Sequence, residues 1–359
     1  MNQLYHSLNK DQTSQLPYSL FRSKLSWRLH EFVKAPFFYA WILTFTVLSL
    51  IPFAIRRAFR SCPLYVSGML TFLNIEFLGL LPFMYVLKRD RCLPKLRSYL
   101  VQEVIQLKPE AHFRDWDIVA LHANGYLRRE QLWHTELCIY NGKECSELFR
   151  SFVYCPSLKA NHDDEDERLA VQIYEKSFES YWKSKENYVS TTNDRRKLPK
   201  EVYRYRLAWN AKAVMKKASR WMILVPYYAV IINWGNGLLV FYFGLLLGSC
   251  QLLIYSYSSL CAERRTLFNT PLLILTFLKL KTLQEPGEDL EKWNNISRFM
   301  NTYLLKESVW RDGEFFFDGE DCRAKFESIL TTVISEQVPH IRGSYPELTS
   351  YAMRSMAGF

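Results

Sequence analysis

A long internal repeat constrains the fold of this chain more than any other feature of its sequence. Residues 116–151 align without a gap with residues 293–328, at an offset of 177 residues. The identical pairs are Trp116/Trp293, Asn124/Asn301, Tyr126/Tyr303, Leu127/Leu304, Glu130/Glu307, Trp133/Trp310, Gly142/Gly319, Cys145/Cys322, Phe149/Phe326 and Ser151/Ser328. Sequence similarity at one fixed offset is typical of tandem structural units. The sequence therefore predicts two copies of one module, which a length of 359 residues accommodates.

Six of these paired positions form what we call the repeat signature. They are Trp116, Asn124, Tyr126, Trp133, Gly142 and Cys145 in the first copy, and Trp293, Asn301, Tyr303, Trp310, Gly319 and Cys322 in the second. Aromatic side chains bury large areas and also suit membrane interfaces. We therefore expect the signature aromatic residues to form a small domain core or to contact the membrane. We expect the two cysteines to be small apolar packing residues.

A shorter segment, which we call the opening box, also occurs twice. Residues 16–27 (LPYSLFRSKLSW) recur as residues 198–209 (LPKEVYRYRLAW), at an offset of 182 residues. A proline near the start and apolar residues at helical spacing predict a short amphipathic helix. Two interpretations stay open: the helix lies on a membrane surface, or it forms the cytosolic end of the transmembrane helix that follows it.

Long runs with few or no charges follow each opening box. Residues 35–55 and 221–262 contain no Asp, Glu, Lys or Arg, and residues 61–87 contain only Glu76. About 20 apolar residues span the hydrocarbon core of a bilayer. The sequence therefore predicts four transmembrane helices in two hairpins, at about 36–55, 62–87, 217–233 and 237–260.

The positions of the positive charges predict the orientation. Seventeen Lys and Arg residues lie before and after the two hairpins, against three in the hairpin turns. Because cytosolic segments carry the excess of Lys and Arg, we expect both termini and the central region in the cytosol. The predicted fold class is a mainly α membrane protein with two tandem repeats. Each repeat is a transmembrane helical hairpin followed by a small cytosolic helical or α+β module.

The expected domain organisation follows the repeats. Its parts are a disordered N-terminus (1–15), repeat 1 (16–151, with its cytosolic module at 94–151), a charged linker (152–197), repeat 2 (198–330, with its module at 271–328) and a flexible tail (331–359). In each module we expect a helix at the first signature tryptophan, an extended segment (137–140 or 314–317), and a second helix after the signature glycine. Within the linker, residues 169–188 are expected to form a solvated amphipathic helix.

The sequence contains no recognisable catalytic constellation. The seven histidines form no ligand pair at helical spacing, no two cysteines have C-x-x-C spacing, and no phosphate-binding or nucleophile motif occurs. We therefore expect a non-enzymatic protein without catalytic residues, cofactor or metal site. Glu76 lies inside a predicted span and is a functional candidate by default. We favour hydrogen bonding between helices as its role.

Charge and aromatic content indicate a membrane partner. The net charge is +10, the basic residues flank the apolar runs, and aromatic residues make up 16% of the chain. This pattern suits the anionic lipids and the interfacial belts of a bilayer. We expect a lipid bilayer as a partner and no nucleic acid, because no nucleic-acid-binding motif accompanies the basic residues.

Taken together, these segments resemble the DUP/Cos family of budding-yeast multipass membrane proteins, and specifically its long, two-repeat Cos type. The resemblance covers residues 16–330. It rests on the two opening boxes, the paired hairpins, the W-x(7)-N-x-Y-L-x(2)-E-x(2)-W element and the segment EFFFDGEDC at 314–322. The first copy departs from the pattern at 137–145, where it reads LCIYNGKEC.

The resemblance implies a protein of the endosome and vacuolar system. It implies that the chain promotes, in trans, the ubiquitin-dependent sorting of other membrane proteins into multivesicular endosomes for vacuolar degradation. The implied partners are cargo membrane proteins, other family members and the ubiquitin machinery. Candidate ubiquitin acceptors are Lys159, Lys176, Lys183, Lys185, Lys197, Lys200 and Lys325. The alternative is a transporter or lipid-handling membrane protein that uses Glu76, and a structural membrane organiser is a third interpretation.

Overall fold

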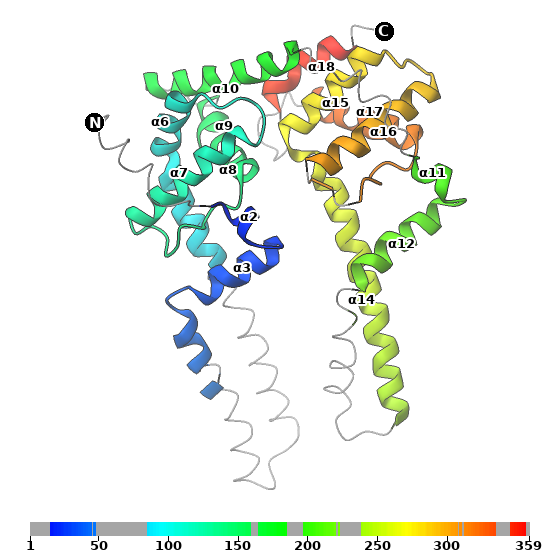
Figure 1. The fold of residues 1–359 in the computed structure, drawn as a ribbon, viewed down its shortest axis with the longest axis horizontal. Helices are drawn as coiled ribbons and strands as arrows, with labels where there is room; N and C mark the ends of the chain where they lie inside the picture. The colour runs from blue at the N-terminus through cyan, green and yellow to red at the C-terminus, as the bar shows by residue number, and fades with distance from the viewer. Residues whose placement is uncertain are drawn as a thin grey trace. The chain divides into compact units, whose positions relative to one another are not determined.

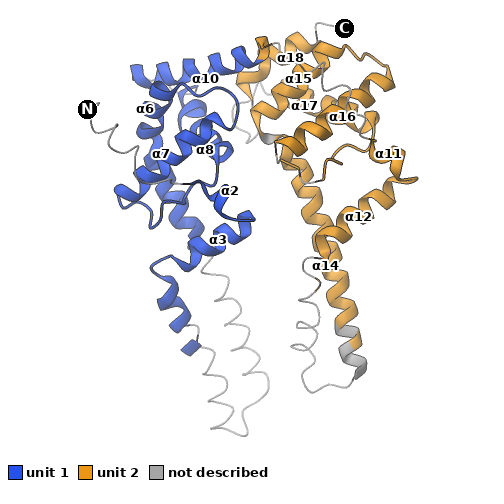
Figure 2. Cartoon of the chain, in the orientation of Figure 1, with its two compact units in different colours: residues 1–181 blue, residues 182–359 orange. Residues whose placement is uncertain are grey.

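The computed structural model shows a mainly helical chain that divides into two compact units, residues 1–181 (unit 1) and 182–359 (unit 2) (Figure 2). The structure describes residues 15–44, 46–47, 85–158, 164–184, 197–219, 222, 238–307, 309–310, 312–334 and 345–356. No strand occurs among these residues (Figure 1). Each unit contains one copy of the repeat, so the predicted mainly α, two-repeat architecture is confirmed for the described residues.

Unit 1 contains the first opening box and the first module. Its elements are the helices α2 (Pro17–Leu20), α3 (Lys24–Val33), α6 (Arg97–Leu107), α7 (Asp115–Arg129), α8 (Gly142–Phe149), α9 (Cys155–Ser157) and α10 (Glu165–Lys183), the 3-10 helix η1 (Leu93–Leu96) and the π-helix η2 (Arg150–Tyr154). The last two residues of α10 belong to unit 2. α7 packs against both α6 and α8, which places the first signature tryptophan inside the module.

Unit 2 contains the equivalent elements of the second copy. They are the helices α11 (Pro199–Val202), α12 (Arg206–Ala218), α14 (Leu238–Thr266), α15 (Pro271–Gln284), α16 (Leu290–Lys306), α17 (Gly319–Ile334) and α18 (Thr349–Met356), and the 3-10 helices η4 (Leu267–Asn269) and η5 (Pro346–Leu348). α16 packs against α15 and α17, and α12 packs against α14. Figure 1 shows α14 as one long helix that extends away from the cluster of α15 to α18.

The same local signals start equivalent helices in the two modules. α8 begins after Asn141, whose side chain accepts a hydrogen bond from the amide of Glu144 (3.1 Å). α17 begins after Asp318, whose side chain accepts one from the amide of Asp321 (2.9 Å). Such caps satisfy amides at the helix start, and acidic residues in the first turn suit the positive end of the helix dipole. The predicted helix after each signature glycine is confirmed.

The segments 137–140 and 314–317, which the sequence predicts to be extended, form irregular loops instead of strands. The reason lies in where their backbone groups find partners, since buried amides and carbonyls need them. The amide and carbonyl of Ile139 bond to the side chain of Asn124 (2.7 and 3.0 Å). Those of Phe316 bond to Asn301 (2.8 and 3.0 Å). An asparagine side chain thus takes the place of a neighbouring strand.

Two segments that the sequence assigns to a linker and a tail contain packed helices. α10 confirms a helix in the part of the linker where one is expected, but it spans Glu165–Lys183 and buries Tyr174 and Phe178 instead of being fully solvated. η5 and α18 lie in the predicted flexible tail, where Leu348 and Ala352 are fully buried and α18 packs against α15. The tail prediction is therefore wrong for these residues. Small and apolar residues three or four positions apart give this short segment a face that packs.

One helical stretch among the described residues is long and apolar enough to cross a bilayer. It comprises the 22 residues Leu245–Thr266 of α14, with a mean hydropathy of 1.4, and only 17% of the residues in its apolar window are buried. It corresponds to the last predicted span, although α14 continues to Thr266 instead of ending at residue 260. Of the other three predicted spans, 36–55 is described only at 36–44 and 46–47, and 62–87 and 217–233 lie almost entirely outside the described residues, so a total of four spans stays a prediction.

The signature glycines let two helices of each module touch at their first turns. A β-carbon on Gly142 would lie 2.1 Å from the carbonyl oxygen of Phe113 and 2.5 Å from the amide nitrogen of Asp117. A β-carbon on Gly319 would lie 2.7 Å from the amide nitrogen of Asn294. Because the opposing atoms belong to the backbone, a side-chain rotation cannot relieve these contacts.

We predict that Gly142→Ala and Gly319→Ala each destabilise their unit by about 3 kcal/mol, because the added methyl group forces the helices apart. Gly125→Ala in α7 is the matched control, since its nearest neighbouring atom would be 3.8 Å away. That change should be neutral or stabilise the unit by up to about 1 kcal/mol. Denaturant unfolding of the purified chain measures all three. An unfolding curve of Gly142→Ala that matches the unmodified chain would contradict the prediction.

Candidate functional site

The first signature tryptophan anchors equivalent helices in the two modules. Trp116 of α7 donates from Nε1 to the carbonyl oxygen of Glu110 (3.0 Å), and its ring lies near that of Phe149 (5.4 Å between centroids). Trp293 of α16 donates in the same way to the carbonyl oxygen of Gly287 (3.0 Å). Both tryptophans are buried. These residues are part of the module cores, and their polar atoms are used within the fold.

The loop held by each signature asparagine also receives the opening box. In unit 1 the amide of Tyr18 donates to the carbonyl oxygen of Tyr140 (3.3 Å). In unit 2 the amide of Lys200 donates to the carbonyl oxygen of Phe317 (3.2 Å). Trp27 of α3 donates from Nε1 to another carbonyl of the loop in unit 1 (2.7 Å). The two segments that repeat in the sequence are therefore joined in space within each unit.

The signature cysteines lie inside the module cores. Cys145 and Cys322 are fully buried and form no disulfide. Burial raises the pKa of both thiols, so they stay protonated near neutral pH. This environment suits small packing residues. Tyr126 and Tyr303 are half-buried, and the ring of Tyr126 stacks on that of Tyr99 (4.2 Å between centroids).

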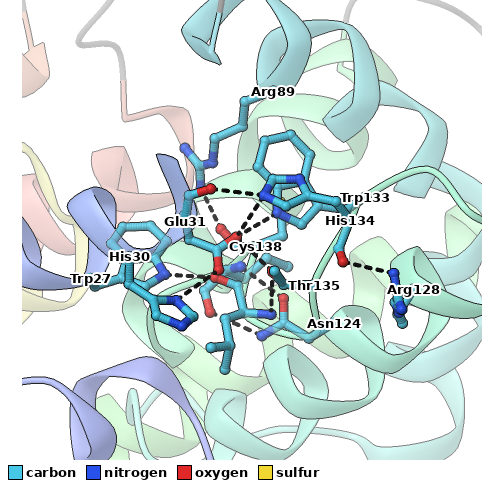
Figure 3. A network of polar contacts seen from close by, with 12 residues as sticks. Trp27, His30, Glu31, Arg89, Asn124, Arg128, Trp133, His134, Thr135 and Cys138 are labelled. Carbon is cyan, nitrogen blue, oxygen red and sulfur yellow. Dashed lines mark hydrogen bonds and ion pairs between the residues drawn. The ribbon is translucent and has the colours of Figure 1, made fainter. Parts of the chain in front are cut away.

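The second signature tryptophan differs between the two copies, and this difference marks the candidate site. Trp133 is 1% exposed, whereas Trp310 is half-buried. Trp133 donates from Nε1 to Oε2 of Glu31 in α3 (2.7 Å), and Glu31 is fully buried. Thr135 donates from Oγ1 to the same carboxylate oxygen (2.6 Å). Figure 3 shows Glu31 within a polar network that joins α3 to the loop after α7.

Two imidazole rings lie beside this carboxylate. His134 Nε2 is 2.8 Å from the backbone carbonyl oxygen of Glu31, which can only accept, so Nε2 carries the proton. Its Nδ1 is buried without a hydrogen-bond partner among the described residues. His30 Nδ1 lies 3.5 Å from Oε1 of Glu31. Burial lowers the pKa of His134, and this effect outweighs the attraction of the Glu31 carboxylate.

The geometry makes this network a structural joint that does not expose a reactive group. The Glu31 carboxylate is closed off from solvent, so no solute reaches it. Its two hydrogen bonds hold α3 on the module, because breaking them would leave a buried charge without partners. Proton uptake by His134 would place a second charge in the same buried space.

Unit 2 makes the equivalent joint with different chemistry. Ala213 occupies the position that corresponds to Glu31. α12 instead presents Lys212, whose Nζ is 3.7 Å from Glu314, and Lys216, which pairs with Asp312. Both lysines are exposed, and ion pairs between exposed side chains contribute little to stability. The helix of the opening box is therefore held on its module by a buried carboxylate in unit 1 and by surface ion pairs in unit 2.

Sequence reasoning did not select Glu31, His30 or His134. A usable signal was present, because Glu31 follows Trp27 by four residues and so shares its face of the helix. The tryptophan face of an opening box is the face that packs on the module. A carboxylate on such a face needs hydrogen-bond donors, which would have directed attention to the loop around Trp133.

The candidate ubiquitin acceptors differ in their accessibility. Those exposed in the structure are Lys176, Lys183, Lys197 and Lys200. Lys325 is half-buried, its Nζ lies 5.5 Å from the ring centroid of Phe268, and burial lowers its pKa. Lys159, Lys185 and Glu76 lie outside the described residues. Within the described part of the chain, no group of three or more His, Cys, Asp or Glu residues is placed to hold a metal ion.

Comparison with known proteins identifies related sequences. The model of the DUP family matches residues 60–161 and 238–338, which together make up more than half of the chain. The two matched regions overlap the two copies of the repeat. No solved structure matches the chain.

Curated relatives are similar over nearly the whole length. Protein COS1 of Saccharomyces cerevisiae is 28% identical over 347 residues, which cover 91% of this chain and 87% of the relative. Protein COS2 of the same organism is 28% identical over 347 residues, covering 91% of this chain and 86% of the relative. Protein COS4 is 28% identical over 345 residues with the same two coverages as COS2.

We predict that Glu31→Ala destabilises unit 1 by about 3 kcal/mol, because the indole N–H of Trp133 and the hydroxyl of Thr135 lose their buried acceptor. Glu31→Gln keeps one carbonyl oxygen as an acceptor and should cost about half as much. Denaturant unfolding followed by tryptophan fluorescence measures both variants. Equally small losses for the two would show that the carboxylate does not hold α3.

A second prediction concerns pH. A lowered pKa of His134 in the folded state means that the unfolded chain binds its proton more readily. Folding is therefore favoured most when His134 is neutral in both states, which holds above the unfolded pKa of about 6.5. Part of this stability is lost as the pH falls from there through the folded pKa of His134. We therefore expect amide hydrogen exchange in α3 and in the loop 130–140 to accelerate between pH 7 and pH 5.

His134→Gln is the matched control for the pH prediction. The glutamine amide can donate to the Glu31 carbonyl as Nε2 does, and it does not titrate. After correction for the intrinsic pH dependence of exchange, this variant should show a flatter profile in these two segments. An unchanged profile would assign the effect to other groups.

Proposed function

This chain belongs to the DUP family, and on that premise we propose that it is a non-enzymatic membrane-trafficking factor. In this proposal it promotes the ubiquitin-dependent sorting of other membrane proteins into multivesicular endosomes for vacuolar degradation. It acts in trans, so that ubiquitin on this chain serves cargo that carries none. The protein is a multipass membrane protein of the endosome and vacuolar system with both termini in the cytosol.

One observation carries this proposal: the exposed lysines lie outside the module cores and close to the junction of the two repeats. Lys176 and Lys183 lie on α10, Lys197 lies directly before the second opening box, and Lys200 lies within it. All four are exposed. A conjugating enzyme needs an amine that it can approach from solvent, and these positions meet that need. In contrast, Lys279 and Lys281 of α15 are buried.

The way in which the modules use their polar groups also supports a role without catalysis. Asn124 and Asn301 use both functions of their amides on backbone groups of their own loops. Glu31 is closed off by Trp133 and Thr135. Other molecules can therefore contact the described modules only at their outer surface. A sorting factor that binds other proteins needs such a surface.

Support for membrane insertion comes from α14. Its residues Leu246, Ile254 and Tyr255 are 64%, 69% and 65% exposed, and the helix is long enough to span a bilayer. A row of exposed apolar side chains of this size is costly in water and stable in a hydrocarbon environment. The charge asymmetry around the predicted hairpins supports cytosolic termini.

The proposal predicts that changing the six lysines of the repeat junction to arginine abolishes sorting in trans. They are Lys159, Lys176, Lys183, Lys185, Lys197 and Lys200. The measurement is the delivery of a surface membrane protein, stripped of its own acceptor lysines, to the vacuole lumen of yeast that overproduces this chain. Arginine keeps the positive charge but accepts no ubiquitin, so delivery should fall to the level seen without overproduction.

Lys325→Arg is the matched control, because this lysine is half-buried against Phe268 and should not be needed. Its variant should deliver the cargo as the unmodified chain does. Full delivery by the six-lysine variant, at equal abundance and in the same compartment, would contradict ubiquitin attachment at the repeat junction. A lack of delivery by the unmodified chain would overturn the sorting role itself.

A further inference from the structure

The helices α3 and α12 each carry an apolar face that no described residue of their own unit covers. In α3, Leu25 and Leu29 are 59% and 60% exposed. In α12, Leu207 and Met215 are 79% and 49% exposed. Leu25 and Leu207 occupy equivalent positions of the two opening boxes. Large apolar side chains this exposed at matching sites of a repeat indicate a shared partner surface.

Helix geometry separates these side chains from the face that packs on the module. Leu25 and Leu29 are four residues apart and lie on one face of α3, while Trp27 points to the other side. Trp27 and Trp209 are each 2% exposed, and they lie against Tyr140 and Phe317 of their loops (5.1 and 5.4 Å between ring centroids). The tryptophan therefore fixes the rotation of each helix and turns its leucine face outward.

The charges beside these faces favour an anionic partner. Arg28 lies beside the leucine face of α3, Arg22 and Lys34 flank the two ends of the helix, and all three are exposed. None of these three forms an ion pair with any residue that the structure describes. Lys24 lies over the ring of Tyr140 instead (5.2 Å from Nζ to the centroid). The one acidic side chain of α3 is Glu31, which is buried on the opposite face. In unit 2, Arg204 and Arg206 flank Leu207 and are exposed as well, and Arg206 pairs with Asp321 of α17.

The apolar faces continue into segments that are themselves exposed and apolar. After α3, the side chains of Tyr39 and Leu43 are 72% and 68% exposed. α12 packs against α14, which carries the candidate membrane span. A bilayer covers such neighbouring surfaces together, with leucine side chains in the acyl boundary and long basic side chains reaching the phosphates.

We propose that α3 and α12 are interfacial helices that lie in the headgroup region of an anionic bilayer, with Leu25, Leu29, Leu207 and Met215 inserted. The proposal rests on the membrane insertion proposed above and decides between the two interpretations of the opening box. Each module is then held against the bilayer surface through its tryptophan. Phosphate groups of anionic lipids bind the basic residues beside each leucine face.

Photo-crosslinking from single positions tests the proposal in the full chain. Benzoylphenylalanine replaces Leu25 or Leu207, both exposed, so the module cores stay intact. The chain is placed in nanodiscs of phosphatidylcholine with or without phosphatidylserine, irradiated, and analysed for lipid and protein adducts. Ile254 of α14 is the membrane control, and the exposed Glu130 and Glu320 are the water-facing controls.

The expected result is lipid adducts at positions 25 and 207 with yields close to that at position 254, and no such adducts at positions 130 and 320. Omitting phosphatidylserine should lower the yield several-fold at positions 25 and 207 and leave position 254 unchanged. Adducts with a second copy of the chain or with another protein, or no adducts, at 25 and 207 would overturn the proposal if position 254 still reacts with lipid. If position 254 also forms no lipid adducts, the membrane insertion on which the proposal rests is overturned.

Discussion

One asparagine side chain in each module holds the loop on which the rest of that unit is assembled. Asn124 and Asn301 are almost completely buried, and each both donates to and accepts from the backbone of its loop. An unpaired buried backbone group costs about 1–3 kcal/mol, so a loop without a neighbouring strand needs such a partner. Once fixed, the loop offers its remaining carbonyls, and these bind the opening box through Tyr18 or Lys200.

The two units share this frame and differ at the joint that it supports. Unit 1 fixes α3 with the buried Glu31 carboxylate, whereas unit 2 fixes α12 with exposed lysine pairs at Glu314 and Asp312. Removing a partner of a buried carboxylate is costly, whereas surface ion pairs contribute little and are screened by salt. The opening helix therefore has the same placement in both units, with its leucine face outward. The side chains that attach this helix to the module differ between the two units.

Much of the architecture can be predicted from the amino-acid sequence, and particular residues show why. The offset between Trp116 and Trp293 identifies the tandem modules, and the glycine at 142 or 319 marks the start of a helix because capping residues precede it. The prediction of extended segments at 137–140 and 314–317 is wrong, because apolar residues there suggest strands. Nothing local in the sequence indicates that their backbone partners are an asparagine side chain fifteen residues earlier.

By itself, the amino-acid sequence determined the repeat, the helices after its signature residues, and the presence of apolar stretches long enough to span a membrane, because periodicity and composition are local properties. Only the tertiary structure decided that the first signature tryptophan and the signature cysteine of each copy are core, that Glu31 is buried, and that the leucine faces of α3 and α12 point outward. Burial depends on contacts between segments far apart in the chain, such as Trp133 with Glu31. The spacing of Trp27 and Glu31 shows that they share a helix face, but it does not identify the distant residue that contacts that face.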